Sequence, residues 1–553
     1  MVHISRTGWR VCLWLLALLA IPLMGWSQST RGALAGTVSD PSGAVIANAQ
    51  IVAIQVETQT KYEAISSSAG AYRFPELSLG RYDVTVSAPG FAPLTQTGVL
   101  ITINSTAALN VTLKPGGTNE TVTVDASSPT IESETSDMSG TISQKQIQDL
   151  PLSMAGGVGG LRSPETFAFL VPGTTGPGSA VGGTAFNSNG VFLGKIAGGQ
   201  TYGSETLLDG SSIQRSENGS SFDETSPSIE ALQEFKVTTA TPSAEFGRST
   251  AGFESFATKG GANSMHGSAY TFVKNAAFDG NNWYNNGYWV FDNCSANPTS
   301  AVCQSYRRPQ DSKFDYGGTF SGPVWIPHIY NGHDKTFFLF AWEQFRLSQG
   351  GSVTSTVPTA AEKQGDFSAL LGGPTAVINP CDGKAVLQNQ IFDPATTNAT
   401  VSATNPNGIP CREPFVGNKV PTGRFSKAAG AMMTGLPDPN QNPLTTSIYG
   451  FGGNYTTGWT NPNQNTTYTI RVDHSFSEKS HLYASYSSRD NWSVHGAINL
   501  PMPFNNSGYL QDFETHYPRA GWDYSFTPNL LNHLNAGYNR TNSINYAYQV
   551  NSP

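Results

Sequence analysis

The feature that most constrains the fold of this chain is a strict alternation of apolar and polar side chains near its C-terminal end. Between Thr467 and Phe476, one set of alternate residues is aromatic, aliphatic or histidine: Tyr468, Ile470, Val472, His474 and Phe476. The residues between them are all polar: Thr467, Thr469, Arg471, Asp473 and Ser475. Because side chains of a β-strand point alternately to its two faces, this pattern predicts a strand with one apolar face. A run of about ten such residues suits a transmembrane β-strand between lipid and water.

Short turns and long loops alternate between the strands predicted in this region. Ser477–Ser480 is long enough only for a tight turn, whereas Asp490–Thr515 is predicted to be a long loop before the alternation returns at Arg519–Phe526. This asymmetry is typical of outer-membrane barrels. A soluble β-sandwich also alternates, but the loop lengths favour the barrel. Aromatic strand ends favour it too, at Phe476, Tyr517 and Phe526.

The composition agrees with a neutral, aromatic-rich β-protein. Of the 553 residues, 13% are charged and 11% aromatic, with 58 Gly, 34 Pro and a net charge of −8. Globular chains average about 25% charged residues. Low charge with many aromatic residues argues against a disordered chain. The lack of a basic cluster argues against a nucleic-acid partner.

The first 27 residues are predicted to be a secretory signal peptide. Arg6 and Arg10 precede the apolar run Val11–Met24, and Gly25-Trp26-Ser27 provides small residues before a cleavage point. The apolar run is shorter than the ~20 residues that a membrane-spanning helix needs. The mature chain is therefore expected outside the cytoplasm.

Four cysteines remain after this cleavage, and they fall into two local pairs. In an oxidising compartment we expect two disulfides, Cys294–Cys303 and Cys381–Cys411, although two other pairings are compatible with the sequence. A zinc site is disfavoured because no C-x-x-C pair and no adjacent histidine accompany these residues. No metal site and no cofactor are predicted.

Residues 28–115 are predicted to form a small β-sandwich. Short alternating segments, such as Gly80–Val86, are separated by turn residues every 8–12 positions. The order G-x-V-x-D-x-x-G, G-x-Y-x-F-x-x-L and G-x-Y-x-V-x-V, followed by Gly90-Phe91, resembles the carboxypeptidase regulatory-like (transthyretin-like) module. No set of His and Glu zinc ligands follows it. The resemblance therefore implies a structural or binding role.

Residues 116–140 contain a short β-branched run before a flexible, Ser/Thr/Glu-rich stretch. By composition this run is one more edge strand. Its position suggests a detachable strand that pairs with the sheet edge of another protein. It resembles the TonB box of TonB-dependent outer-membrane receptors. The resemblance implies that the contact with a TonB-type protein is made by Glu120, Thr121, Val122, Thr123, Val124, Asp125 and Ala126.

Residues 141–264 carry an ordered series of motifs that resembles the plug domain of those receptors. The series comprises Ile147–Ser153, Phe169–Gly173, Leu208–Gly210, Ile229–Val237, Ser243–Arg248 and Thr258–Asn263. With the regulatory-like module ahead of the plug, the chain resembles the Oar-like group of TonB-dependent receptors. Glycine-rich loops at 155–163 and 173–200, and Phe253–Phe256, depart from the family pattern. Plug-loop contacts of the family are therefore not carried over.

The family resemblance implies a mainly β chain: a β-sandwich, an α+β plug and then an antiparallel transmembrane barrel from residue 265 to 553. Further strands are predicted at His266–Lys274, Lys313–Gly322 and Lys335–Arg346, the last with two apolar faces. About eight strands are expected there, roughly 36 residues apart, whereas a plugged transporter barrel has about 22 strands. The sequence is therefore expected to be an N-terminal fragment of the receptor, with an incomplete barrel.

These features favour a transporter over an enzyme. No H-E-x-x-H, G-x-S-x-G or Walker motif is present. The resemblance implies an outer-membrane receptor that imports a scarce or bulky ligand, such as an oligosaccharide or peptide. Its expected partners are a TonB-type protein of the inner membrane, outer-membrane lipid and an extracellular ligand. A secreted or surface-attached adhesin that binds carbohydrate is the alternative. No ligand-binding residue can be assigned from the sequence.

Overall fold

Strands dominate the computed structural model. It describes residues 30–116, 122–125, 134–149, 163–176, 194–215, 225–298, 303–304, 306–308, 310–441, 453–495, 500, 504, 508–527 and 530–547. The predicted signal peptide lies outside these ranges. Within them, no helix has the length and apolar character needed to cross a membrane.

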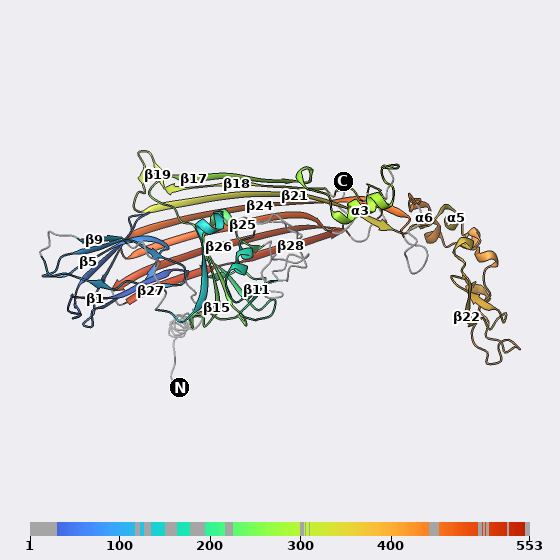
Figure 1. Ribbon diagram of the computed structural model, residues 1–553, viewed down its shortest axis with the longest axis horizontal. Coiled ribbons are helices and arrows are strands. Elements are labelled where there is room, and N and C mark those ends of the chain that lie inside the picture. Colours follow the sequence, from blue (N-terminus) through green and yellow to red (C-terminus); the bar gives the residue numbers. More distant parts are fainter. Residues whose placement is uncertain are drawn as a thin grey trace, which may run out of the picture.

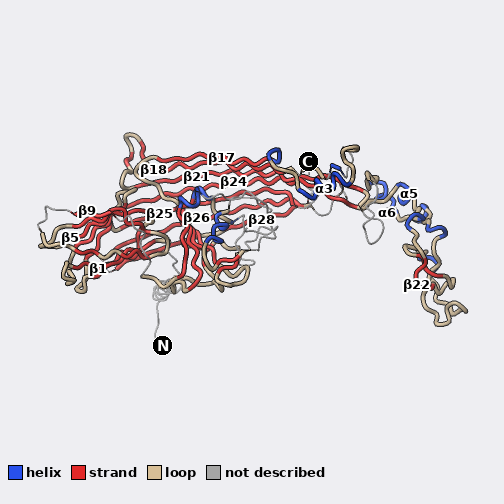
Figure 2. Tube along the Cα trace, viewed as in Figure 1, coloured by secondary structure: helices blue, strands red, loops and turns tan. Residues whose placement is uncertain are grey.

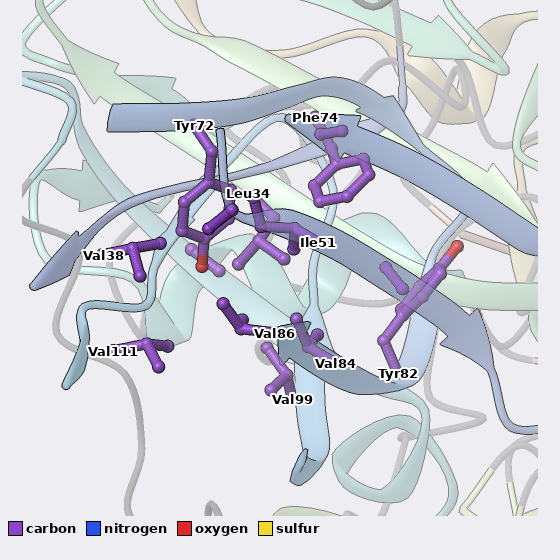
Figure 3. Packing of buried hydrophobic residues seen from close by; sticks show 14 of the residues in the cluster. Leu34, Val38, Ile51, Tyr72, Phe74, Tyr82, Val84, Val86, Val99 and Val111 are labelled. Atoms are coloured by element: carbon purple, nitrogen blue, oxygen red, sulfur yellow. The ribbon is translucent and has the colours of Figure 1, made fainter. Parts of the chain in front are cut away.

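Two sheets form the N-terminal sandwich. The first contains β4, β1 and β7, with β8 also paired to β1, and the second has the order β3-β2-β5-β6-β9. Their bounds are β1 Gly32–Ser39, β2 Gln50–Gln55, β3 Lys61–Ile65, β4 Ala71–Leu77, β5 Gly80–Ser87, β6 Leu94–Ile101, β7 Thr106–Ala108, β8 Val111–Thr112 and β9 Val122–Asp125. Alternate residues of these strands, including Leu34, Ile51, Tyr82 and Val84, fill one apolar core (Figure 3). The predicted alternation of apolar and polar side chains therefore corresponds to sheets with one face turned towards the core.

A second unit is built around a five-stranded sheet of order β10-β15-β16-β13-β14. Its strands are β10 Met138–Ser143, β13 Glu205–Leu208, β14 Ser211–Ser212, β15 Leu232–Ala240 and β16 Phe253–Thr258. The smaller elements are α2 Gln144–Asp149, η2 Pro164–Leu170, η5 Ile229–Ala231, β11 Thr174–Thr175 and β12 Lys195–Ile196. Phe235 and Phe256 stack at 4.4 Å between ring centroids in its core.

The largest sheet has eight antiparallel strands of order β17-β18-β21-β24-β25-β26-β27, with β28 also paired to β26. Their bounds are β17 His266–Asn275, β18 Asp311–Pro323, β21 Thr336–Ser355, β24 Tyr455–Ser477, β25 Ser480–His495, β26 Tyr509–Thr527, β27 Leu530–Gly537 and β28 Arg540–Ala547. The sheet is curved and open, and the second unit lies against its inner face (Figure 1). The expectation of a mainly β chain with a sandwich and an unclosed barrel is confirmed.

The two faces of the barrel sheet differ as the alternation predicted. In β24, Ile470 and Val472 are exposed on the outer face, whereas Thr467 and Thr469 are buried on the inner face. The apolar strand β21 serves two environments: Leu339 is 2% exposed on the inner face and Phe340 is 40% exposed on the outer face. Its double apolar character therefore reflects burial on one side and a lipid-facing position on the other.

Two details of the predicted barrel were wrong. Tyr517 does not end a strand at the membrane surface, because it lies within β26 and packs inward on the core of the second unit. The loop predicted at Asp490–Thr515 is much shorter, because β25 continues to His495 and β26 already begins at Tyr509. The Asn, Gly and Pro residues that suggested a loop lie mainly between these extensions, which hold buried apolar residues such as Val494, Leu510 and Phe513.

A lobe between β21 and β24 extends beyond the end of the sheet opposite the sandwich (Figures 1 and 2). It holds α5 Ala360–Lys363, η7 Ser368–Leu370, β22 Pro374–Ile378, β23 Ala385–Leu387, η8 Pro394–Thr396, η9 Val416–Asn418, η10 Thr422–Arg424 and α6 Lys427–Gly435. Near the same end, the connection between β17 and β18 contains η6 Ala276–Phe278 and α3 Trp283–Phe291. The short strands β19 Trp325–Ile326 and β20 Tyr330–Asn331 form a hairpin between β18 and β21.

Candidate functional site: a buried plug contact and a candidate partner strand

An Asp-Gly turn forms the point of the second unit that reaches the barrel wall. Asp209 and Gly210 join β13 to β14, and both have positive φ, at 47° and 79°. A two-residue hairpin turn with both residues at positive φ favours Asp-Gly because the turn then matches the strand twist. The L-D-G motif is therefore a hairpin tip.

Two of the plug-like sequence motifs, Leu208–Gly210 and Thr258–Asn263, meet at this tip. The buried Asp209 carboxylate accepts hydrogen bonds from the Thr258 backbone N–H at 3.0 Å and from its hydroxyl at 2.8 Å. The parallel pairing of β13 with β16 places Thr258 there, two residues beyond the pair Leu208–Phe256. The following Gly261 lies against the barrel strand β21, where a Cβ would come within 2.7 Å of the Phe338 carbonyl oxygen.

Barrel side chains complete the shell around Asp209. The Arg471 guanidinium lies 3.6 Å from the Asp209 carboxylate and donates a hydrogen bond to the Thr258 hydroxyl at 2.8 Å. The Asp209 carbonyl accepts hydrogen bonds from the Tyr483 hydroxyl at 3.2 Å and the Asn535 amide at 2.8 Å. Sequence reasoning placed Arg471 on the inner face but gave it no role. A lone arginine on that face of an alternating strand was the available signal.

A buried carboxylate pair lies elsewhere in the second unit. Glu254 of β16 is fully buried and accepts a hydrogen bond from the Thr206 hydroxyl at 3.2 Å. Glu165 is also fully buried and accepts one from the Ser226 hydroxyl at 2.6 Å. Burial, together with the charge of Glu165, raises the pKa of Glu254 well above its usual range, although Thr206 opposes the shift. Burial also raises the pKa of Glu165.

The sandwich is fixed to the second unit by two charged side chains of β15. The Glu234 carboxylate accepts a hydrogen bond from the Ile103 backbone N–H at 2.7 Å. The Lys236 ammonium donates one to the Asn104 carbonyl at 2.7 Å and lies 3.0 Å from the Asp137 carboxylate. Because charged groups are strongly disfavoured in a dry interface without partners, these bonds fix the relative position of the two units.

A second contact joins the sandwich to the barrel rim. Arg31 and Asp523 form a largely buried ion pair at 2.5 Å, and the rings of Tyr62 and His481 lie 5.0 Å apart. Burial alone would lower the pKa of Arg31, but Asp523 and neighbouring groups outweigh it and raise the pKa. A polar cavity of about 350 Å³ lies where sandwich, second unit and barrel meet.

The candidate TonB-box segment lies on the edge of the sandwich. Its residues 122–125 form β9, which pairs in parallel with β6: Leu94 with Val122, and Thr97 with Asp125 at the other end. Glu120, Thr121 and Ala126 lie outside the described residues. The structure therefore places the backbone of four of the seven predicted partner-binding residues in one strand.

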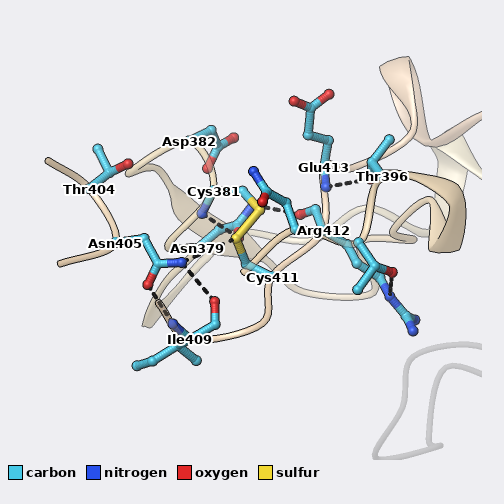
Figure 4. Close-up of a disulfide and its surroundings, with 12 residues drawn as sticks. Asn379, Cys381, Asp382, Thr396, Thr404, Asn405, Ile409, Cys411, Arg412 and Glu413 are labelled. Carbon is cyan, nitrogen blue, oxygen red and sulfur yellow. Dashed lines mark hydrogen bonds between the residues drawn. A yellow bond between two sulfur atoms is a disulfide. The ribbon is translucent and has the colours of Figure 1, made fainter. Parts of the chain in front are cut away.

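The four cysteines form two local disulfides, Cys294–Cys303 and Cys381–Cys411. Around the second, the Asn405 amide donates to the Ile409 carbonyl at 2.7 Å and the Asn379 amide donates to the Arg412 carbonyl at 3.0 Å (Figure 4). This disulfide thus clamps a lobe held largely by polar contacts.

Aromatic side chains are exposed near the first disulfide. On α3, Trp283 is 78% exposed, and Tyr284 and Tyr288 are also exposed. Trp459 lies against Gly351 of the neighbouring strand. Among the described residues, no group of three or more His, Cys, Asp or Glu side chains could hold a metal ion.

An open β-barrel sheet with a separate unit inside it and a sandwich at one end defines an outer-membrane receptor architecture. The family model for an outer membrane beta barrel domain matches residues 257–552, more than half of the chain. A second model, the carboxypeptidase regulatory-like domain, matches residues 33–114. The chain belongs to the outer-membrane β-barrel family, and with its regulatory-like module it is similar to the Oar-like TonB-dependent receptors. It is a protein of the outer membrane.

A curated relative and several solved structures are similar to this chain. The TonB-dependent transporter Oar of Myxococcus xanthus is 29% identical over 240 residues, 42% of this chain and 21% of that protein. The chain thus matches about a fifth of the length of this relative. The outer-membrane transporter YddB of Escherichia coli is 10% identical, with a TM-score of 0.38 over 73% of this chain and 38% of that one. A ferric enterobactin receptor of Pseudomonas aeruginosa is 12% identical, with a TM-score of 0.31 over 73% and 49%.

Proposed function

We propose that the whole receptor imports a scarce or bulky ligand across the outer membrane. The central observation is the unit built on the sheet β10-β15-β16-β13-β14, which packs inside the barrel sheet and is held by Asp209, Arg471 and Thr258. A plug in that position would block passage until it is rearranged. We assign residues 28–115 to the sandwich, 116–140 to the TonB-box segment and linker, and 265–553 to the barrel.

The energy for this rearrangement would come from an inner-membrane TonB-type protein that uses the proton gradient. It would bind residues 120–126, immediately ahead of the plug in the chain. The support is the resemblance of this segment to a TonB box and the position of β9 at a sheet edge, where backbone groups can pair with another strand. Pulling on this segment would act on the plug through the linker that follows it.

The ligand would bind at the extracellular end, where the disulfide-clamped lobe and α3 lie. Exposed aromatic rings such as Trp283 and Tyr284 could stack on the apolar faces of sugar rings, so an oligosaccharide is the first candidate and a peptide the second. We propose no enzymatic activity, in keeping with relatives that are transporters. Family membership favours this function over that of a secreted adhesin.

Deletion of residues 120–126 tests the proposal. Uptake of the ligand should be abolished, while binding of the same ligand to intact cells should be unchanged, because the extracellular side is intact. A deletion of equal length in the linker, residues 127–133, is the control for a general effect of shortening. Unchanged uptake in the first variant would contradict the proposed mechanism.

A further inference from the structure

The strand β9 is held by the sandwich as the last strand of a sheet. The sheet has the order β3-β2-β5-β6-β9, and in the described part of the chain β9 pairs only with β6. A strand in that position uses the backbone groups of one edge and leaves those of its other edge available. The candidate partner-binding segment is thus already in the extended conformation that strand addition requires.

The length of this pairing is set by β6. Its partner residues run from Leu94 to Thr97, and the next residue, Gly98, has a φ of +74° and donates its N–H to the Asp83 carboxylate at 3.0 Å. The register between β5 and β6 also shifts there. Because this irregularity bends the edge of β6, the straight part of the edge ends where the pairing with β9 ends.

The sandwich that carries β9 is itself anchored. Glu234 and Lys236 of the plug bond to its Ile103–Asn104 loop, and Arg31 pairs with Asp523 of the barrel. The edge strand is therefore held on a domain docked at the rim of the barrel. A preordered strand loses less conformational entropy on binding than a disordered segment does.

We infer that β9 acts as an interaction surface while it remains in the sandwich sheet, and that a β-strand of the TonB-type partner adds to its outer edge. The partner strand would become the sixth strand of the sheet and would pair through backbone hydrogen bonds. This inference rests on the proposed function and specifies the state of residues 122–125 in the complex. If the inference holds, the force exerted by the TonB-type partner acts on the sandwich as well as on the linker to the plug.

A reversible cross-link between β6 and β9 tests the inference. Thr95 and Thr123 are paired residues, and the Thr95 hydroxyl contacts that of Thr85 at 3.0 Å on the sheet face opposite the buried Val84 and Val86. Neighbouring strands lie about 4.8 Å apart, so cysteines at paired positions fall within disulfide range. The double variant Thr95→Cys/Thr123→Cys, in the full-length receptor in detergent, should form the cross-link on mild oxidation.

The probe is the purified periplasmic domain of the TonB-type protein from the same organism. Its Kd for the oxidised double variant should lie within about threefold of that for the reduced form, a change below the ~1.4 kcal/mol of a tenfold effect. The single variants Thr95→Cys and Thr123→Cys are the matched controls. Loss of binding on oxidation, with recovery on reduction, would overturn the inference, because it would show that β9 must leave the sheet.

Hydrogen exchange gives a second measurement. In the free receptor the amides that join residues 94–97 and 122–125 should exchange slowly, and the partner should slow exchange in 122–125 without increasing it in 94–97. Faster exchange in 94–97 on partner binding, or failure of the cross-link to form, would also overturn the inference. Absence of partner binding to the reduced and wild-type receptors alike would instead contradict the proposed function.

Discussion

Asp209 contacts both the plug and the barrel wall, which its sequence motif alone did not indicate. Its carboxylate binds Thr258 of the plug, and the guanidinium of Arg471 on the barrel wall lies beside both residues. The geometry of the turn explains why Asp and Gly occupy the tip of the hairpin. The role of Asp209 as a buried hydrogen-bond acceptor depends instead on the side chains around it. A single side chain thus couples the fold of the plug to its place in the barrel.

Replacing this carboxylate should loosen the plug. We expect Asp209→Ala to lower the stability of the receptor by about 3–5 kcal/mol, the usual cost of removing one partner of a buried ion pair. Thermal unfolding in detergent measures the loss, and increased entry of a large antibiotic into cells measures plug leakage. Asp473→Asn is the control, since Asp473 also pairs with Arg471, at 2.8 Å, but belongs to the barrel strand. Equal effects of both variants would contradict a specific role of Asp209.

The buried Glu254 predicts a pH dependence of the opposite sign to that of a salt-bridged carboxylate. Burial raises its pKa in the folded state, so the folded protein binds a proton more strongly than the unfolded chain does. Stability should therefore fall as pH rises from the unfolded value of about 4.3 towards the raised folded pKa. Glu254→Gln should remove part of this fall, measured as the difference between melting temperatures at pH 4.5 and pH 8. An unchanged difference would contradict an ionisable Glu254 as its source.

At the scale of elements, the sequence predicted the strands better than their ends. The alternation in residues 467–476 identified β24 and its two faces, yet β24 begins at Tyr455 because polar residues on both faces continue to pair with β21. The loop after β25 is shorter because its flanking strands continue through buried apolar residues such as Leu510 and Phe513. Contacts such as Asp209–Arg471 and Arg31–Asp523 were beyond sequence reasoning, because they join residues hundreds of positions apart whose pairing depends on how three units dock.

The disulfides should differ in their effect on the lobe. Cys381–Cys411 closes a separation of 30 residues and Cys294–Cys303 one of 9. Loop-closure entropy gives about 3–4 kcal/mol for the longer loop and about 2–3 kcal/mol for the shorter one. Cys381→Ser/Cys411→Ser should therefore make the lobe sensitive to protease at lower protease concentrations, whereas Cys294→Ser/Cys303→Ser should leave the lobe unchanged. Equal protease resistance of the lobe in the first variant and the wild type would contradict its role as a clamp.

At the scale of the whole molecule, three units meet at the end of the barrel opposite the lobe. The buried pair of Arg31 and Asp523, together with the bonds of Glu234 and Lys236, fixes the sandwich against plug and barrel. These charged side chains are far from β9 in sequence, but they determine where the candidate partner strand is presented. We therefore expect the docking of the sandwich to matter for the proposed uptake separately from the partner contact itself.

Breaking this docking should separate partner binding from transport. Arg31→Ala leaves Asp523 with one buried partner fewer, and we expect a stability loss of about 3–5 kcal/mol and faster proteolysis between sandwich and plug. Binding of the TonB-type periplasmic domain should persist because β9 is intact, whereas uptake should fall. Glu63→Ala, which removes an exposed pair within the sandwich, with Lys61 at 2.6 Å, is the control. Normal uptake by the Arg31 variant would show that docking is dispensable.

The length of β24 sets how far this strand extends beyond the membrane. Its 23 residues span about 78 Å, or about 60 Å along the barrel axis at a tilt near 40°. The outward apolar residues are confined to its last third, Tyr468–Phe476, and the hydrocarbon band of such barrels is only about 25 Å tall. Roughly 35 Å of this strand therefore extends beyond the hydrocarbon band. Because the lobe connects β21 to β24, and these two strands pair along the whole length of β21, they hold the lobe well beyond the membrane surface.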